Sequence, residues 1–207
     1  METMKKTYLI LTGLPMLFLV TLLLTSCSDK DSTTSDTTYE TTDDDIAEDG
    51  DSFTLECSTS DAEQSANTEI ETMRQAVVDF RNSLTNTLLE EVSVCLDDER
   101  FYLWHNTPAN NDNRDGITYG DLSDDQLVAF KDILQLFLSA GGYQKVYEIT
   151  ELSEGWLHDV QSTVWDPDFY SIDMFGDPET SGSWGFQLDG HHCAINFLVH
   201  GDNVSIV

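Results

Sequence analysis

Residues 184–200 read WGFQLDGHHCAINFLVH, and this stretch decides the fold that we expect. Apolar and polar side chains alternate on both sides of Asp189-Gly190, which is typical of β-strands with one buried face. Asp-Gly is a strong signal for a two-residue hairpin turn, so two antiparallel strands should meet there. Residues 170–174 alternate in the same way and predict a preceding strand, while residues 204–207 predict a following one.

Upstream of these strands the apolar spacing becomes helical. Apolar side chains recur every three or four residues over 68–89, behind a capping-box pattern that begins at Thr68. A second helix should begin at the Ser123 cap and end at the glycine pair 141–142. A third should follow directly and break near Gly155. We therefore predict an α+β fold, with N-terminal helices followed by an antiparallel β-meander, over residues 67–207.

The N-terminus has the features of a bacterial lipoprotein signal. Two lysines precede an apolar stretch, and residues 24–27 read Leu-Thr-Ser-Cys, which resembles a lipobox. There the signal peptide, residues 1–26, is removed and Cys27 receives the lipid, which holds the protein at a membrane. We expect an exported protein, with Ser28 favouring the outer membrane or cell surface over the inner membrane. The alternative, an uncleaved transmembrane helix, leaves Cys27 unexplained.

The mature chain should be strongly acidic throughout. Residues 27–66 are rich in Ser, Thr and Asp and carry too few apolar residues to fold, so we expect a flexible tether. The full chain has 39 Asp and Glu against 9 Lys and Arg, a net charge of −30. A protein with this negative charge repels the phosphate backbones of nucleic acids, so nucleic acid is not an expected partner. The expected partners are the membrane, through the lipid, and an envelope protein or a small ligand.

Three cysteines remain besides the lipid site. In an oxidising compartment Cys57, Cys95 and Cys193 allow one disulfide and one leftover thiol. A bridge from Cys57 to Cys95 would close a loop of roughly forty residues and contribute about 4 kcal/mol. The other pairings stay open on the sequence alone.

The pair His191-His192 is the first candidate for chemistry. With His105 as a further ligand, it could hold a transition metal and support an exported metal-dependent hydrolase. Neighbouring residues on a regular strand point to opposite faces, so both imidazoles would reach one ion only at a turn or bulge. The competing interpretation makes His191 a core residue beside Phe186 and His192 a polar-face neighbour. The sequence requires no cofactor and identifies no catalytic residue.

Four further residues are candidates for ligand binding. Arg100 and Arg114 stand out in an acidic domain, and they would either hold an anionic ligand or pair with neighbouring acids. Trp104 and Trp184 would either stack on a sugar or another flat ligand or belong to the core. No nucleophile motif or phosphate-binding glycine loop accompanies them.

Several motifs from Asp98 onward resemble the uncharacterised family catalogued as domain of unknown function 3500. They are Glu99-Arg100, Trp104-His105-Asn106-Thr107-Pro108, Arg114-Asp115-Gly116-Ile117, Asp121-Leu122-Ser123, Phe175-Gly176-Asp177-Pro178 and the run from Trp184 to His192. The resemblance covers roughly residues 68–207. The family pattern continues for about another hundred residues, and the apolar end of this chain also resembles the middle of a strand. We therefore expect an incomplete domain. The resemblance implies no activity.

Overall fold

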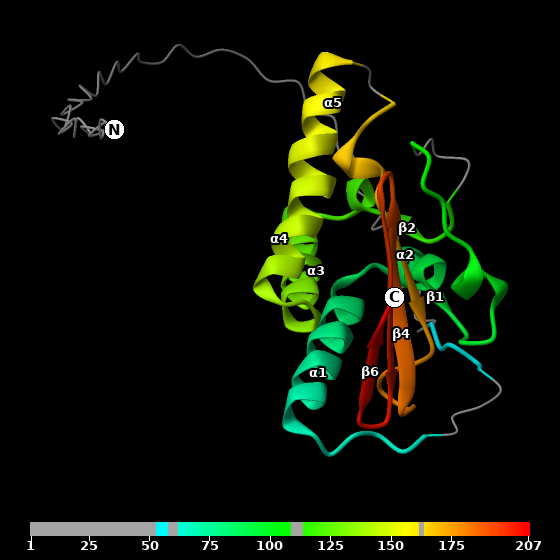
Figure 1. Ribbon diagram of the computed structural model, residues 1–207. Helices are drawn as coiled ribbons and strands as arrows, with labels where there is room; N and C mark the ends of the chain where they lie inside the picture. The colour runs from blue at the N-terminus through cyan, green and yellow to red at the C-terminus, as the bar shows by residue number, and fades with distance from the viewer. Residues whose placement is uncertain (1–52, 58–61, 109–113, 162–163) are drawn as a thin grey trace, which may run out of the picture. The chain divides into compact units, whose positions relative to one another are not determined.

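A six-stranded, mostly antiparallel sheet with most of the helices on one side forms the described part of the chain (Figure 1). The computed structural model describes residues 53–57, 62–108, 114–161 and 164–207. The signal peptide, Cys27 and most of the predicted tether lie outside the described residues. The predicted α+β fold, with its main helices before its main strands, is confirmed.

The first predicted helix is two helices. The helical segments are α1 (Thr68–Ser83), α2 (Asn86–Val92), α3 (Asp124–Phe137), α4 (Ala140–Tyr147) and α5 (Glu154–Val160). Leu84 and Thr85 have extended backbones and separate α1 from α2, and the Thr85 side chain caps the new helix by accepting from the Leu88 N–H. The cap of α1 is Asn67, one residue before the predicted Thr68. Both differences arise because a polar side chain that satisfies free N–H groups can start a helix wherever the backbone turns.

The later helices begin where the sequence indicates but end elsewhere. Ser123 caps α3 through the capping box with Gln126. The helix ends at Phe137 rather than at the glycine pair, because Ser139 caps α4 and places both glycines inside it. The expected break near Gly155 is a π-helix over Glu148–Ser153, which joins α4 to α5.

The meander is confirmed, with its strands lying in chain order. They are β3 (Ser171–Phe175), β4 (Ser183–Gly190), β5 (Cys193–His200) and β6 (Asn203–Ile206). Two short strands, β1 (Ser93–Val94) and β2 (Ile117–Thr118), pair with different halves of β3. The first is parallel to β3 and the second antiparallel.

The turn between β4 and β5 lies two residues later than predicted. Gly190 pairs with Cys193 in the ladder, so His191 and His192 form the turn. Glycine is required at 190 for packing, because a Cβ there would lie 2.0 Å from the Tyr170 ring. The turn conformation falls on His192 instead, whose φ of 61° is one that glycine or asparagine usually adopts.

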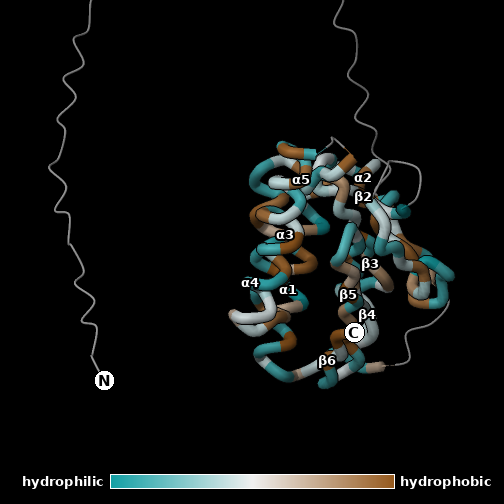
Figure 2. The backbone as a smooth tube through the Cα atoms, turned by 45° about the horizontal axis from the view of Figure 1, so that its top comes forward, coloured by the Kyte–Doolittle hydropathy of each residue, from teal (hydrophilic) through white to brown (hydrophobic). Residues whose placement is uncertain are grey.

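The sheet has an apolar face towards the helices and a polar face on the other side. Figure 2 shows hydrophobic and hydrophilic residues mixed along the strands and helices. The core residues on the helix side of the strands are Ile172, Met174, Trp184, Phe186, Leu188, Phe197 and Val199. Polar residues occupy alternate positions on β3 and β4, yet they are buried as well: Ser171, Asp173, Gln187 and Asp189.

Residues 96–108, named here the covering segment, account for this second buried face. The segment contains the 3₁₀ turn Glu99–Tyr102, and it lies across the sheet from the helices (Figure 1). The Phe101 ring packs edge-on against Phe175, with centroids 5.0 Å apart. Alternation therefore predicted the strands correctly but not the burial of their polar side.

A disulfide and a polar cluster fix the ends of this arrangement. Cys57 is bonded to Cys95, which selects one of the three pairings that the sequence left open, and Cys193 is a buried free thiol. Residues 53–57 form no strand, so the bridge rather than sheet pairing attaches them.

Among the described residues, no helix combines the length and the apolar character needed to cross a membrane.

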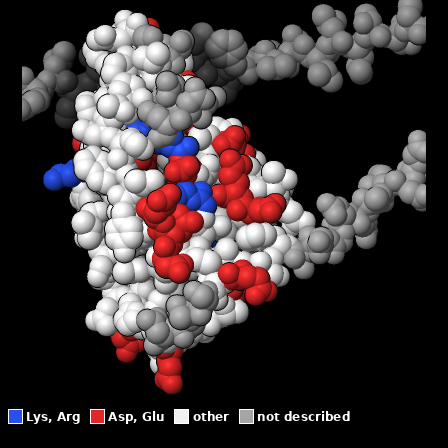
Figure 3. Space-filling model, turned by 90° about the vertical axis from the view of Figure 1, so that its right-hand side faces the viewer, with Lys and Arg blue, Asp and Glu red and all other residues white. Residues whose placement is uncertain are grey.

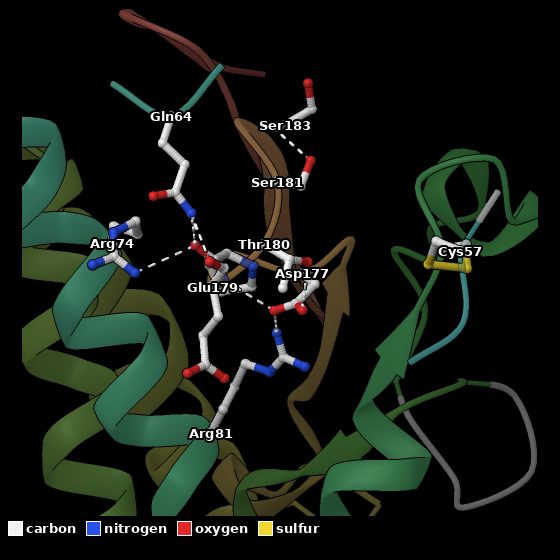
Figure 4. Close-up of polar contacts among 11 residues, drawn as sticks. Cys57, Gln64, Arg74, Arg81, Asp177, Glu179, Thr180, Ser181 and Ser183 are labelled. Atoms are coloured by element: carbon white, nitrogen blue, oxygen red, sulfur yellow. Dashed lines mark hydrogen bonds and ion pairs between the residues drawn. A yellow bond between two sulfur atoms is a disulfide. The ribbon is translucent and has the colours of Figure 1, made fainter. Parts of the chain in front are cut away.

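The polar cluster holds the β3–β4 connection against α1 (Figure 4). The Arg81 guanidinium lies 3.2 Å from the Asp177 carboxylate. Arg74 donates to the Pro178 carbonyl, and the Gln64 amide donates to the Glu179 carbonyl at 2.7 Å. These contacts are between neighbouring elements, so we assign the cluster a structural role.

Candidate ligand-binding groove

The buried polar face of the sheet is paired with two arginines. Arg100 donates from Nη1 to the Asp173 carboxylate at 3.0 Å. Burial raises the pKa of Asp173 to about 7, although the Arg100 charge acts in the opposite direction. The sequence left two roles for Arg100, and the structure shows it pairing with an acid.

Arg114 pairs with the second buried carboxylate. Its Nε lies 3.5 Å from Asp189 Oδ2, and its side chain is only 4% exposed. Burial raises the pKa of Asp189 and lowers the pKa of Arg114, while each charge partly offsets the effect on the other. Neither arginine therefore presents a free charge to an anionic ligand.

These buried groups also hold the main chain of the covering segment. Gln187 donates to the Leu103 carbonyl at 2.9 Å, and Asp189 accepts from the His105 N–H at 3.0 Å. Arg114 donates to the His105 and Thr107 carbonyls at 2.9 and 2.7 Å. Residues 103, 105 and 107 are thus tied by their backbone to the polar layer.

The residues between these anchors line a groove. Trp104 and Asn106 form it together with side chains from the turn and the last strands, and its volume is about 430 Å³, within the range of small-molecule sites. The other lining residues are His192, Ala194, Asn196 and Val207. We call this the Trp104 groove. It brings together two predicted candidates, Trp104 and His192, with two asparagines that the sequence did not single out.

Two features of the lining favour the binding of a polar ligand. The Oδ1 atom of Asn196 is buried and has no hydrogen-bond partner among the described residues. An unpaired buried acceptor costs about 1–3 kcal/mol, so a ligand donor would be favourable if the Asn196 amide rotated towards the groove. Trp104 remains 58% exposed, although its neighbours are anchored by buried groups.

His192 owes its position to its buried neighbour. His191 Nδ1 lies 2.8 Å from Glu154 Oε2, and both side chains are buried. The Tyr170 hydroxyl donates to the His191 carbonyl, and Trp165 packs on the imidazole with centroids 4.5 Å apart. These contacts fix the turn, so His192 is held at the rim of the groove in its left-handed conformation. His191 is thus a core residue, with Glu154 as its partner.

The histidines do not assemble a metal site in this structure. The imidazoles of His191 and His192 are adjacent, with centroids 3.6 Å apart, because both lie in the turn. His191 is already bonded to Glu154, and the exposed His105 contacts the sheet through its backbone. Within the described ranges, no group of three or more histidine, cysteine or acidic side chains is placed to hold an ion.

Trp184 does not belong to the groove, and of the two places that the sequence left open for it, it occupies the core. It is 2% exposed and packs edge-on against Phe137 in the helix-side core. Its alternation with Phe186 and Leu188 already placed it on the apolar face. The other anchoring residues, Asp173, Gln187 and Asp189, were missed because their burial depends on the covering segment.

The surface on this side of the molecule is acidic. Figure 3 views the side on which the covering segment lies, and acidic side chains crowd there around a few basic atoms. The groove lining itself contains no Lys, Arg, Asp or Glu side chain. The Trp104 groove thus lacks Lys, Arg, Asp and Glu side chains, although acidic side chains crowd the surface on this side of the molecule.

Comparison with known proteins identifies a family without a described activity. The family model described as "Protein of unknown function (DUF3500)" matches residues 66–207. No curated protein and no solved structure shows significant similarity to the chain.

Proposed function

The chain belongs to the DUF3500 family of proteins of unknown function, and from this premise we propose that it is an exported, lipid-anchored protein that binds a small ligand in the Trp104 groove. The anchoring rests on the sequence. Two lysines, an apolar stretch and Leu-Thr-Ser before Cys27 match the requirements for lipoprotein processing. The disulfide between Cys57 and Cys95 agrees with an oxidising compartment.

One observation carries the binding proposal: buried polar groups immobilise the backbone on both sides of an exposed tryptophan. Gln187 and Asp189, each at most 5% exposed, bond to residues 103 and 105. Burying such groups is costly unless they are well paired, and apolar residues in place of both partners of a buried ion pair would often be as stable. What the polar layer achieves is a fixed backbone at Trp104, and a binding residue whose main chain is already ordered loses less entropy when it binds.

The binding proposal can be tested with a matched pair of tryptophans. Trp156 on α5 is 59% exposed, against 58% for Trp104, and it does not line the groove. We expect a thermal-shift screen of small polar compounds on the full chain to yield ligands that bind in the groove. Their effect should disappear in Trp104→Ala and persist in Trp156→Ala. The proposal would be contradicted if the compounds still stabilised Trp104→Ala, or if the screen yielded no ligand.

The anchoring proposal has a separate test. Cells that express the full chain are grown with an alkyne-tagged fatty acid, and the chain is recovered and examined for the tag. We expect labelling that Cys27→Ala abolishes, together with release of the protein from the membrane fraction. Unlabelled parent protein would refute lipidation without affecting the binding proposal.

A further inference from the structure

We propose that the ligand of the Trp104 groove is a neutral carbohydrate, an inference that rests on the proposed function. The proposal joins three properties of the groove: a flat aromatic platform, uncharged hydrogen-bonding groups around it and a surrounding charge that disfavours anions. Each property excludes a different class of ligand.

The aromatic platform excludes ligands without an apolar face. Trp104 is 58% exposed, and hydrogen bonds to its neighbours at 103 and 105 fix the backbone that carries its indole ring. A pyranose ring has a face of C–H groups that covers an indole and removes apolar area from water. The hydroxyl groups at the edge of the sugar remain free to bond with the groove walls.

The groove walls carry amides and an imidazole. Asn106 and Asn196 each have one acceptor oxygen and two N–H donors, a combination that suits adjacent sugar hydroxyls. The Asn196 Oδ1 has no partner among the described residues, but it is shielded from solvent, so a sugar hydroxyl would pair with it only after the amide rotates towards the groove. His192 adds a further polar group at the rim. A purely apolar ligand would leave these groups unpaired.

Charge excludes an anionic ligand. The lining has no Lys or Arg, and Arg100 and Arg114 are paired with Asp173 and Asp189 beneath the covering segment. The chain carries a net charge of −30, so uronic acids, phosphates and carboxylates are repelled. A cationic ligand would be attracted by the negative charge of the protein, but the lining has no acidic side chain and a single tryptophan, whereas cation-binding sites of this kind usually combine several aromatic rings. A neutral polyol satisfies all three properties.

A glycan array probed with the full chain tests the proposal. The chain is purified in a detergent without a sugar headgroup, and the array carries neutral, uronic acid-containing and amino sugar-containing saccharides. We expect binding to neutral saccharides, with a loss of about tenfold or more in affinity for Trp104→Ala, as a missing aromatic contact implies. Asn196→Ala should weaken binding about fivefold, through one lost hydrogen bond. Trp156→Ala should bind like the parent.

Uronic acids give an internal check on the charge argument. They should bind more weakly than their neutral counterparts in low salt, and the difference should narrow as salt screens the field. Thermal unfolding of Trp104→Ala establishes that the variant is folded. Since Trp104 is largely exposed, its midpoint should stay close to that of the parent.

The outcomes separate the two proposals. If no neutral saccharide binds in a Trp104-dependent manner, the carbohydrate inference is overturned. If a non-carbohydrate from the thermal-shift screen then binds through Trp104, the groove remains the site and only the ligand class is wrong. If neither assay yields a Trp104-dependent ligand, both proposals fail. Preference for amino sugars over neutral ones would also overturn the inference, because it would make the acidic field the main attraction.

Discussion

Replacing Asp173 by asparagine tests how much the buried charge beneath the covering segment weakens the fold. The residue is 5% exposed, and burial raises its pKa from an ordinary value of 3.8 to about 7 against the effect of Arg100. In the unfolded chain the carboxyl titrates near its ordinary value. The difference corresponds to about 4 kcal/mol when fully expressed. The Arg100 side chain is 22% exposed, so water also reaches this pair and reduces the cost of burying the carboxylate. We therefore expect the raised pKa to change the free energy of unfolding by about 2 to 4 kcal/mol.

The sign follows from the proton balance. The pKa of Asp173 is higher in the folded state, so between about pH 4 and pH 7 the folded chain holds a proton that the unfolded chain has released. The free energy of unfolding therefore falls as the pH rises through this window. Asparagine has no such proton. The stability of Asp173→Asn relative to the parent should therefore increase by about 2 to 4 kcal/mol between pH 4 and pH 8.

Urea denaturation of both proteins at several pH values measures this difference. Other acids titrate in both chains, so their effects cancel when the two free energies of unfolding are subtracted. Asp159→Asn is the control, since it removes an acid from the exposed surface of α5. The difference in free energy of unfolding between Asp159→Asn and the parent should vary with pH by no more than about 0.5 kcal/mol. A difference for Asp173→Asn that is equally independent of pH would refute the reasoning about burial.

Four further perturbations address other parts of the fold. Reducing the Cys57–Cys95 bond should lower the free energy of unfolding by about 4 kcal/mol, because it frees a 38-residue loop; denaturation with and without reductant checks this. His192→Gly should raise the thermal midpoint by relieving about 1 kcal/mol of left-handed strain, and it should weaken ligand binding in the same protein. Gly116→Ala should cost at least about 2 kcal/mol in a chemical denaturation experiment, because its φ is 75° and its Cβ would lie 2.0 Å from a carbonyl oxygen. Gly141→Ala in the same experiment should be neutral or stabilising, because nothing lies within 4 Å of the added methyl group.

The sequence predicts the elements of this fold better than their contacts. Alternation identified β4 and the core side of Trp184, because a strand presents every second residue to the same face. It did not locate the turn, because Gly190 is required by Tyr170 rather than by the turn itself. The Asp-Gly rule considers only the local backbone, whereas the packing partner lies on another strand.

The site was only partly predictable for a related reason. Trp104 and Arg114 were candidates because of their residue types, but sequence alone could not separate an exposed Trp104 from a buried Trp184 except through alternation. The roles of Asp173 and Asp189 depend on a segment about seventy residues or more away that folds over them. Short-range patterns hold no information on such a contact.

The cost of the buried polar layer and the exposure of Trp104 are two aspects of one arrangement. Apolar contacts are not directional, so a covering segment that packed only through apolar side chains would have no fixed register on the sheet. Gln187 and Arg114 donate hydrogen bonds to carbonyls of the segment and Asp189 accepts one from its His105 N–H, so individual backbone atoms define the position of the segment. Apolar substitutions that replace both partners of a buried pair and preserve volume should therefore lose less stability than binding affinity. That divergence is the consequence expected of groups retained to position a ligand-binding residue rather than to hold the fold together.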